Sequence, residues 1–124
     1  MSILTAEQLM ERSIQVCEDR KAEKLEVYDV RGESILADYY LFCSGNSSPH
    51  ITAIRNSLDK TFRSEGIMPK SIEGSPESQW ILMDYADILI HIFQPDAREF
   101  YNVEALLDIE RRIYPAADNT AETD

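Results

Sequence analysis

Two short apolar runs in the second half of the chain set the pattern from which the fold is predicted. Residues 80–83 and 88–93 are apolar and rich in β-branched and aromatic side chains, and a polar segment separates them. Each run is too short for a free-standing helix, so both are interpreted as strands of an antiparallel hairpin. The connection Asp84-Tyr-Ala-Asp87 lacks the Asn-Gly or Gly-X of the commonest tight turns, which predicts a wider turn or a bulge.

Both faces of this hairpin are mostly apolar. Side chains of a strand alternate between its two faces. In the first run Trp80 and Leu82 alternate with Ile81 and Met83, and in the second Ile88, Ile90 and Ile92 alternate with Leu89, His91 and Phe93. A sheet that is apolar on both faces needs cover on both sides.

Apolar residues at helical spacing predict three amphipathic helices. The first begins at Thr5, with Gln8 completing a capping box, and ends near Arg20. The second has Ser48 as its N-cap and Pro49 at its first position, and it ends at Gly66 in a left-handed conformation. The third is capped by Asn102, and its predicted buried side consists of Val103, Leu106, Leu107, Ile109 and Ile113.

Further strands are predicted at residues 25–30, 38–44 and about 70–73, which gives an α/β fold with a five-stranded mixed sheet. Residues 1–114 are predicted to form one domain. Residues 115–124 lack apolar bulk and are predicted to be a disordered acidic tail.

Three helices are too few to cover both faces of such a sheet. Apolar surface around Trp80, Tyr85, Phe100 and Tyr101 is therefore expected to stay exposed. An exposed aromatic patch on a small protein indicates an interface with a partner.

Composition narrows the class of partner. The net charge of −11 and a pI near 4.5 count against binding to DNA or RNA, because phosphate contacts need clustered Lys and Arg. The charge suits a basic protein partner, although keeping the protein soluble explains it equally well. No apolar run approaches the ~18 residues of a membrane span, and the N-terminus lacks a signal-peptide pattern. A cytoplasmic protein is expected, with Cys17 and Cys43 as buried small hydrophobes.

Candidate catalytic chemistry is weak. Asp84 and Asp87 could bind Mg²⁺ for nucleotidyl transfer, but such carboxylates need a spacing of two on one strand, and here the spacing is three across a turn. Turn formation is the favoured role of both. The loop 44–48 precedes a predicted helix but has no phosphate-binding Lys, and neither His50 nor His91 has identifiable catalytic partners. We expect no catalysis, no cofactor and no metal.

Seven motifs together resemble the ribosomal silencing factor (Iojap-like) family. They occur in the family's order between about residues 5 and 107: Lys21-Ala-Glu, Leu36-Ala-Asp-Tyr-Tyr40, Cys43-Ser-Gly-Asn-Ser47, Glu73-Gly74, Trp80-Ile-Leu-Met-Asp-Tyr85, Asp87-Ile-Leu-Ile-His-Ile-Phe93 and Arg98-Glu-Phe-Tyr-Asn-Val-Glu104. The chain departs from the family pattern in three places. Ala86 stands where Gly is usual, Leu107 replaces a common Trp, and the extension 109–124 is longer.

The resemblance implies a nucleotidyltransferase-like core without catalytic carboxylates. It further implies binding to the large ribosomal subunit through its universal protein number fourteen, which blocks the small subunit and represses translation when nutrients are short. Family members can also form homodimers. The partner surface of the family falls here on Trp80, Asp84, Tyr85, His91, Arg98 and Tyr101. Within this set Trp80 and Tyr85 are expected to supply apolar contact area, Asp84 to accept hydrogen bonds, and Arg98 to orient the aromatic segment.

Two other functions stay open on the sequence alone. One is a small Mg²⁺-dependent nucleotidyltransferase that uses Asp84 or Asp87. The other is a homodimerisation module whose aromatic patch meets its own copy.

Overall fold

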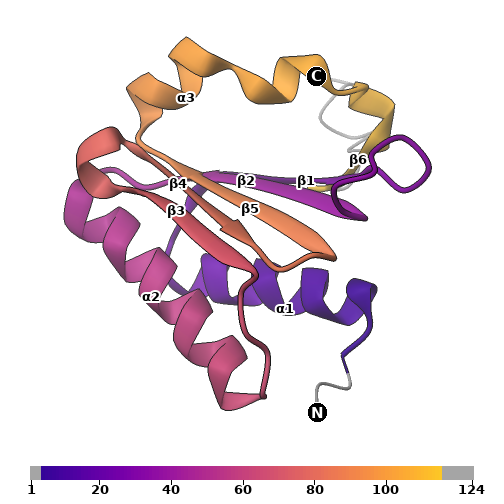
Figure 1. Cartoon of the computed structure of the whole chain (residues 1–124). Coiled ribbons are helices and arrows are strands. Elements are labelled where there is room, and N and C mark those ends of the chain that lie inside the picture. The colour runs from indigo at the N-terminus through magenta and orange to yellow at the C-terminus, as the bar shows by residue number, and fades with distance from the viewer. Residues whose placement is uncertain (1–3, 116–124) are drawn as a thin grey trace.

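Among the residues that the structure describes, the sheet has six strands rather than the five predicted (Figure 1). The computed structural model describes residues 4–115. The strands are β1 (Glu23–Asp29), β2 (Tyr39–Ser44), β3 (Ser71–Ser75), β4 (Trp80–Asp84), β5 (Ile88–Phe93) and β6 (Arg112–Tyr114). Their order across the sheet is β3-β4-β5-β2-β1-β6. Strands β2 and β5 pair in parallel and the other neighbours are antiparallel, so the predicted mixed α/β fold is confirmed.

The hairpin formed by β4 and β5 confirms the pattern read from the two apolar runs. Trp80 pairs with Phe93 and Leu82 with His91, which places these four side chains on one face of the sheet. The turn is tight, contrary to the prediction of a wider turn or a bulge: Tyr85 N–H donates to the Ile88 carbonyl at 3.0 Å, so only Ala86 and Asp87 lie between the bonded residues, and the register of the two strands has no shift. Ala86 takes a left-handed conformation there, with φ of 71°.

Helices α1 (Ala6–Asp19) and α2 (Ser48–Ser64) pack together against the lower face of the sheet in Figure 1. The Thr5–Gln8 capping box of α1 is present as predicted. Helix α2 begins one residue earlier than predicted, because Ser47 rather than Ser48 is the N-cap, its Oγ accepting from His50 N–H at 3.2 Å. Gly66 follows the helix with φ of 79°, as expected.

The apolar stripes of these two helices seal that face. The large side chains between them and the sheet are fully buried, among them Ile51, Ile54, Leu58, Phe62, Ile88, Ile90 and Ile92. Cys17 and Cys43 are buried free thiols in this layer, in agreement with the sequence. A hydrogen bond with Cys43 raises the pKa of the Cys17 thiol.

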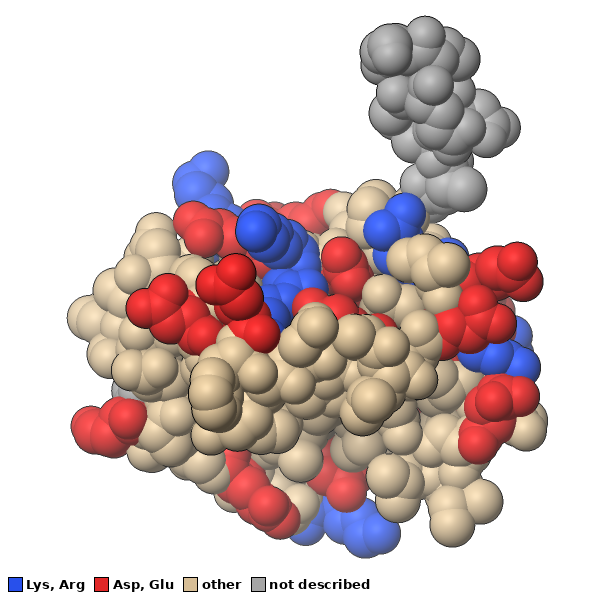
Figure 2. Space-filling model, turned by 90° about the horizontal axis from the view of Figure 1, so that it is seen from above, with Lys and Arg blue, Asp and Glu red and all other residues tan. Residues whose placement is uncertain are grey.

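The third helix is not where the sequence placed it. Helix α3 spans Pro95–Tyr101 and ends at Asn102, which was predicted to begin a helix. Asn102 adopts a left-handed conformation, and its N–H donates to the Arg98 carbonyl at 2.8 Å. Residues 103–106 and 109–111 form 3₁₀ turns instead, and Leu106 and Ile109, predicted to be buried, are 86% and 61% exposed. Figure 2 looks down on this side of the sheet and shows uncharged surface across its middle, with acidic side chains to either side and basic side chains among them.

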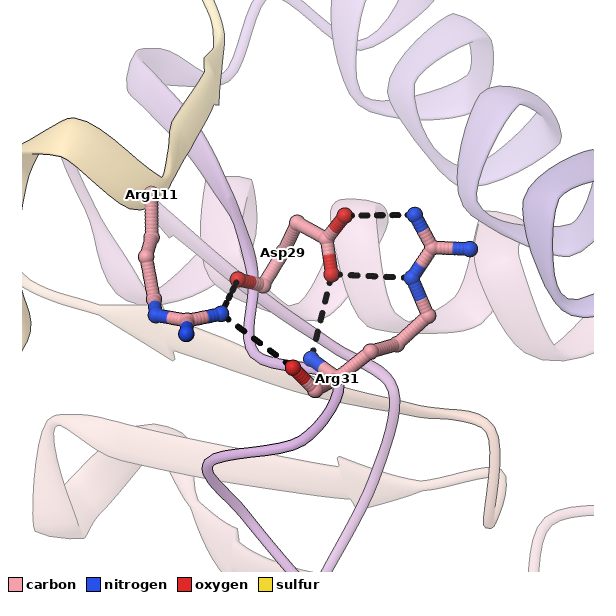
Figure 3. Close-up of polar contacts among 3 residues, drawn as sticks. All are labelled: Asp29, Arg31 and Arg111. Atoms are coloured by element: carbon pink, nitrogen blue, oxygen red, sulfur yellow. Dashed lines mark hydrogen bonds and ion pairs between the residues drawn. The ribbon is translucent and has the colours of Figure 1, made fainter.

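Arginine side chains connect the segment around β6 to the end of β1 (Figure 3). Arg111 donates to the carbonyl oxygens of Asp29 and Arg31, at 3.1 and 3.2 Å. The Arg31 guanidinium in turn forms a two-pronged bond with the Asp29 carboxylate, at 2.9 and 2.6 Å, which lowers the pKa of that carboxyl. Charge-assisted bonds of this kind are strong and directional. The Arg111 bonds and the backbone pairing with β1 hold a three-residue strand that the hydrophobic pattern could not reveal. The predicted tail lies outside the described residues, apart from Pro115.

Candidate protein-binding face

The α3 side of the sheet carries a continuous band of aromatic side chains. Trp80 lies 4.9 Å from Phe93, measured between ring centroids, and the His91 ring stacks on Phe42 at 4.7 Å. Tyr28 then meets Phe42 edge-on at 5.8 Å. These residues come from four adjacent strands, and the pairing register brings them to one face.

The band continues from the sheet onto α3. The ring of Tyr101 is 4.9 Å from Trp80, and Phe100 is 5.0 Å from Tyr101. Phe93 and Phe42 are fully buried, but Trp80 is only half-buried, and Tyr101 and Phe100 are 51% and 80% exposed. The expectation of exposed apolar surface around Phe100 and Tyr101 is therefore confirmed, and it is met in part at Trp80.

This face is only partly covered because α3 is short. The helix and the 3₁₀ turns that follow bring Ala97, Val103 and Leu107 over Phe42 and Phe93. Beyond that cover, Trp80 and Leu82 on β4 reach solvent. Leu106 adds a further exposed aliphatic side chain, which the sequence reasoning missed by assigning it to a buried helical stripe.

Tyr85 does not belong to this face, and the expectation that it is exposed is wrong. Its side chain is 5% exposed and packs edge-on against Phe62 of α2, with ring centroids 4.9 Å apart. Strand alternation explains the placement, since Tyr85 follows Asp84 and so shares the direction of Ile81 and Met83. Burial raises the pKa of its hydroxyl, which has no hydrogen-bond partner within residues 4–115.

His91 contributes to the α3 side of the sheet by a hydrogen bond with Trp80. The indole Nε1–H of Trp80 donates to Nδ1 of His91 at 3.3 Å. His91 is 7% exposed, and burial lowers its pKa from 6.5 to about 4. The imidazole is thus uncharged at neutral pH and remains a hydrogen-bond acceptor, which orients the Trp80 ring.

Arg98 is anchored inside the fold and is 7% exposed. Its Nε donates to Glu104 at 2.6 Å, and its Nη1 donates to the Lys24 carbonyl at 2.7 Å and to Ser44 Oγ at 3.1 Å. These bonds tie α3 to β1 and β2. A hollow of about 430 Å³ with Glu23, Asp96 and Glu99 in its lining lies beside this network, which makes this end of α3 acidic.

Asp84 lies at the end of β4 and has the same facing as Trp80 and Leu82. Its Oδ1 accepts from the N–H of Ala86 at 2.8 Å, which confirms the turn-forming role of this aspartate. Asp84 and Asp87 stand on opposite sides of the turn. In the described part of the chain, no three His, Cys, Asp or Glu side chains are grouped so that they could hold a metal ion.

Residues 3–124 match the family described as ribosomal silencing factor during starvation. The chain belongs to this family. Membership places it among ribosome-associated regulators of translation. Of the helices that the structure describes, none has the length and apolar character needed to cross a membrane.

The bacterial relatives share most of their length with this chain. The ribosomal silencing factor of Bacillus subtilis is 39% identical over 90 residues, which cover 73% of this chain and 76% of that protein. The ribosomal silencing factor of Halalkalibacterium halodurans is 34% identical over 103 residues, which cover 83% and 88%. A mouse protein named mitochondrial assembly of ribosomal large subunit protein 1 is 28% identical over 115 residues, which cover 89% of this chain and 50% of the mouse protein.

A solved structure supports the fold as well. The crystal structure of a Bacillus halodurans protein superposes with a TM-score of 0.74 at 34% identity, covering 82% of this chain and 94% of that one.

Proposed function

We propose that this protein binds the large ribosomal subunit through its α3-side face and blocks docking of the small subunit. Repression of translation under nutrient limitation follows from that block. The observation that carries the proposal is the partly exposed cluster of Trp80, Tyr101 and Phe100 on a protein of net charge −11. Aromatic anchors on a protein of acidic net charge suit a basic protein surface. The partner we propose is the universal protein number fourteen of the large subunit, as the family resemblance implies.

The mechanism is steric and needs no chemical turnover. A bound factor occupies surface that the small subunit requires, so the number of joined ribosomes falls as the factor accumulates. The proposed site of action is the cytoplasm, where bacterial ribosomes work. The nucleotidyltransferase-like core implied by the resemblance would serve here as a scaffold only.

The positions of the residues proposed to bind the partner suggest different roles for them. Trp80 and Tyr101 are proposed to make direct contacts, supported by Phe100 and Leu106, and Asp84 to accept hydrogen bonds at the edge of the patch. His91 and Arg98 are buried and are proposed to position Trp80 and α3. Tyr85, which packs on Phe62, is proposed to stabilise the fold.

Co-sedimentation with purified large subunits tests the proposal. Trp80→Ala and Tyr101→Ala are expected to weaken binding by about 1–4 kcal/mol each, and to restore subunit joining in proportion. Met68→Ala removes an exposed apolar side chain beyond the end of α2 and is the matched control. Unchanged binding of both aromatic variants, with their folds intact, would exclude this face as the docking site.

The enzyme alternative has a separate test. Calorimetric titration with a nucleoside triphosphate and Mg²⁺ is expected to give no heat of binding. A saturable signal that Asp84→Asn or Asp87→Asn abolishes would favour the enzyme instead. For the homodimerisation alternative, sedimentation velocity at rising concentration shows whether the patch meets its own copy.

A further inference from the structure

We infer that a hollow between β3, β4 and α3 receives one lysine or arginine side chain of the protein partner. This inference rests on the proposed function and specifies the chemistry of one contact within it. The hollow has a volume of about 290 Å³ and is lined by Glu73, Gly74, Ser78, Trp80, Leu82 and Tyr101.

Two aromatic rings form one wall of the hollow. Trp80 and Tyr101 come from β4 and α3, and their rings are tilted 43° to one another. Both rings are partly accessible, so a partner side chain can reach them. An aromatic ring attracts a cation through its quadrupole, and Trp does so best.

A carboxylate stands on the same side of the sheet. Glu73 pairs directly with Leu82 in the antiparallel register of β3 and β4, so both side chains project to the α3 face. Glu73 is exposed and forms no ion pair within residues 4–115. None of the six lining residues is basic. The hollow thus offers an aromatic wall, an aliphatic residue and an uncompensated negative charge.

The backbone around the hollow is fixed before any partner binds. Gly74 has φ of 89°, and a Cβ at this position would collide with the carbonyl oxygen of Trp80. Close approach of β3 to β4 therefore requires glycine here. On the other side, Ser78 Oγ lies 3.0 Å from the same Trp80 carbonyl and 3.0 Å from the N–H of Ser75. A fixed frame reduces the entropy lost when a partner side chain enters.

Lysine and arginine match this combination better than other side chains do. Their aliphatic stems can lie against Leu82 and Trp80 while the charged group meets the ring faces and Glu73. A purely apolar side chain would make no use of Glu73 and would be insensitive to its charge. That difference supplies the test.

The test is the affinity of charge variants for purified large subunits. Glu73→Lys is expected to weaken binding more than about tenfold, because it places a like charge against the incoming cation. Glu73→Gln is expected to weaken it by roughly threefold and to flatten the salt dependence. Glu11→Lys is the matched control, since it makes the same change in net charge at an exposed position of α1. Its affinity is expected to stay within about twofold of the parent.

Aromatic variants at position 80 give a second measurement. The affinity is expected to fall in the order Trp, Phe, Leu, because the cation–π attraction weakens along that series while the site stays apolar. If Trp80→Leu binds as well as Trp80→Phe and Glu73→Lys binds as well as Glu11→Lys, the occupant is not a cation and the inference is overturned. The proposed function would survive that result provided Trp80→Ala still loses binding. Unchanged binding of both Trp80→Ala and Tyr101→Ala would instead exclude the α3-side face as the docking site, and with it the proposed function.

Discussion

The two faces of the sheet differ in how much of each is covered by helices and in the side chains that fill it. The α1/α2 face is closed by helices of 14 and 17 residues, and the side chains that fill it are mostly aliphatic and buried. The α3 face has a helix of only 7 residues over it, and it mixes aromatic rings with a buried histidine and a buried arginine. The first arrangement maximises buried apolar area, which stabilises the fold. The second keeps aromatic surface accessible and uses polar contacts to hold it in place.

Removing the buried arginine is expected to have the largest effect on the α3 face. Arg98→Leu would leave the Glu104 carboxylate without its 2.6 Å partner and release α3 from β1. Loss of one member of a buried ion pair destabilises a protein by about 3–5 kcal/mol. Chemical denaturation measures the change.

Arg63→Leu is the control for that variant, because Arg63 pairs with Asp59 on the surface of α2 at 2.7 Å. Its expected cost is below about 1 kcal/mol. Equal losses in the two arginine variants would contradict the anchoring role of Arg98.

A pair of leucine truncations compares the faces directly. Leu58→Ala, in the sealed layer beneath the sheet, is expected to cost about 2–5 kcal/mol of unfolding free energy because it leaves a cavity. Leu106→Ala removes the same atoms from an exposed position and is expected to change stability by less than about 0.5 kcal/mol. Thermal and urea unfolding of both variants give the comparison. Similar losses at the two sites would show that the α3 face is packed as tightly as the other.

Lowering the pH is expected to destabilise the fold through His91 on the α3 face. His91 titrates near 4 in the fold and near 6.5 when unfolded, so only the unfolded chain takes up this proton as the pH falls below 6.5. The neutral imidazole contributes fully to the unfolding free energy above pH 6.5. This contribution, up to about 3 kcal/mol, is lost as the pH falls from 6.5 to 4. His91→Gln keeps a hydrogen-bond acceptor near Trp80 but does not titrate. The difference in unfolding free energy between parent and variant should vary with pH over this window, and a constant difference would refute the assignment.

A small gain in stability is expected on the sealed face. Tyr85→Phe removes a buried hydroxyl that has no partner among the described residues, and should raise the unfolding free energy by about 1 kcal/mol. Binding to large subunits should not change, because the ring lies beneath α2. Weaker binding of this variant would indicate that Tyr85 belongs to the docking surface, and would contradict the assignment of different roles to the two faces.

Much of the scaffold could be predicted from local pattern. The alternation along 80–83 and 88–93 defined the hairpin and divided its side chains, and the Thr5–Gln8 capping box marked the start of α1. Strand β6 was missed because three residues are too few to show the alternation of apolar and polar positions that marks a strand. Its position depends on the contacts of Arg111 with the end of β1. The third helix was misplaced because Asn can either begin a helix or end one in a left-handed conformation.

The candidate site was less accessible from sequence than the scaffold. Residue chemistry pointed to Trp80, Phe100 and Tyr101, which the structure brings together. Continuing the strand alternation by one residue past Asp84 would have sent Tyr85 to the opposite face. The place of Glu73 beside Leu82 depends on the register between β3 and β4, which no local pattern specifies.

Side-chain footprinting of the protein, free and bound to purified large subunits, tests the central claim most directly. The solvent exposure of Trp80, Phe100 and Tyr101 to a radical or carbene probe should fall on binding, while labelling of Met68 beyond the end of α2 should not change. Protection of Met68 with undiminished labelling of the three aromatic residues would contradict the assignment of the α3 face as the ribosome-docking surface.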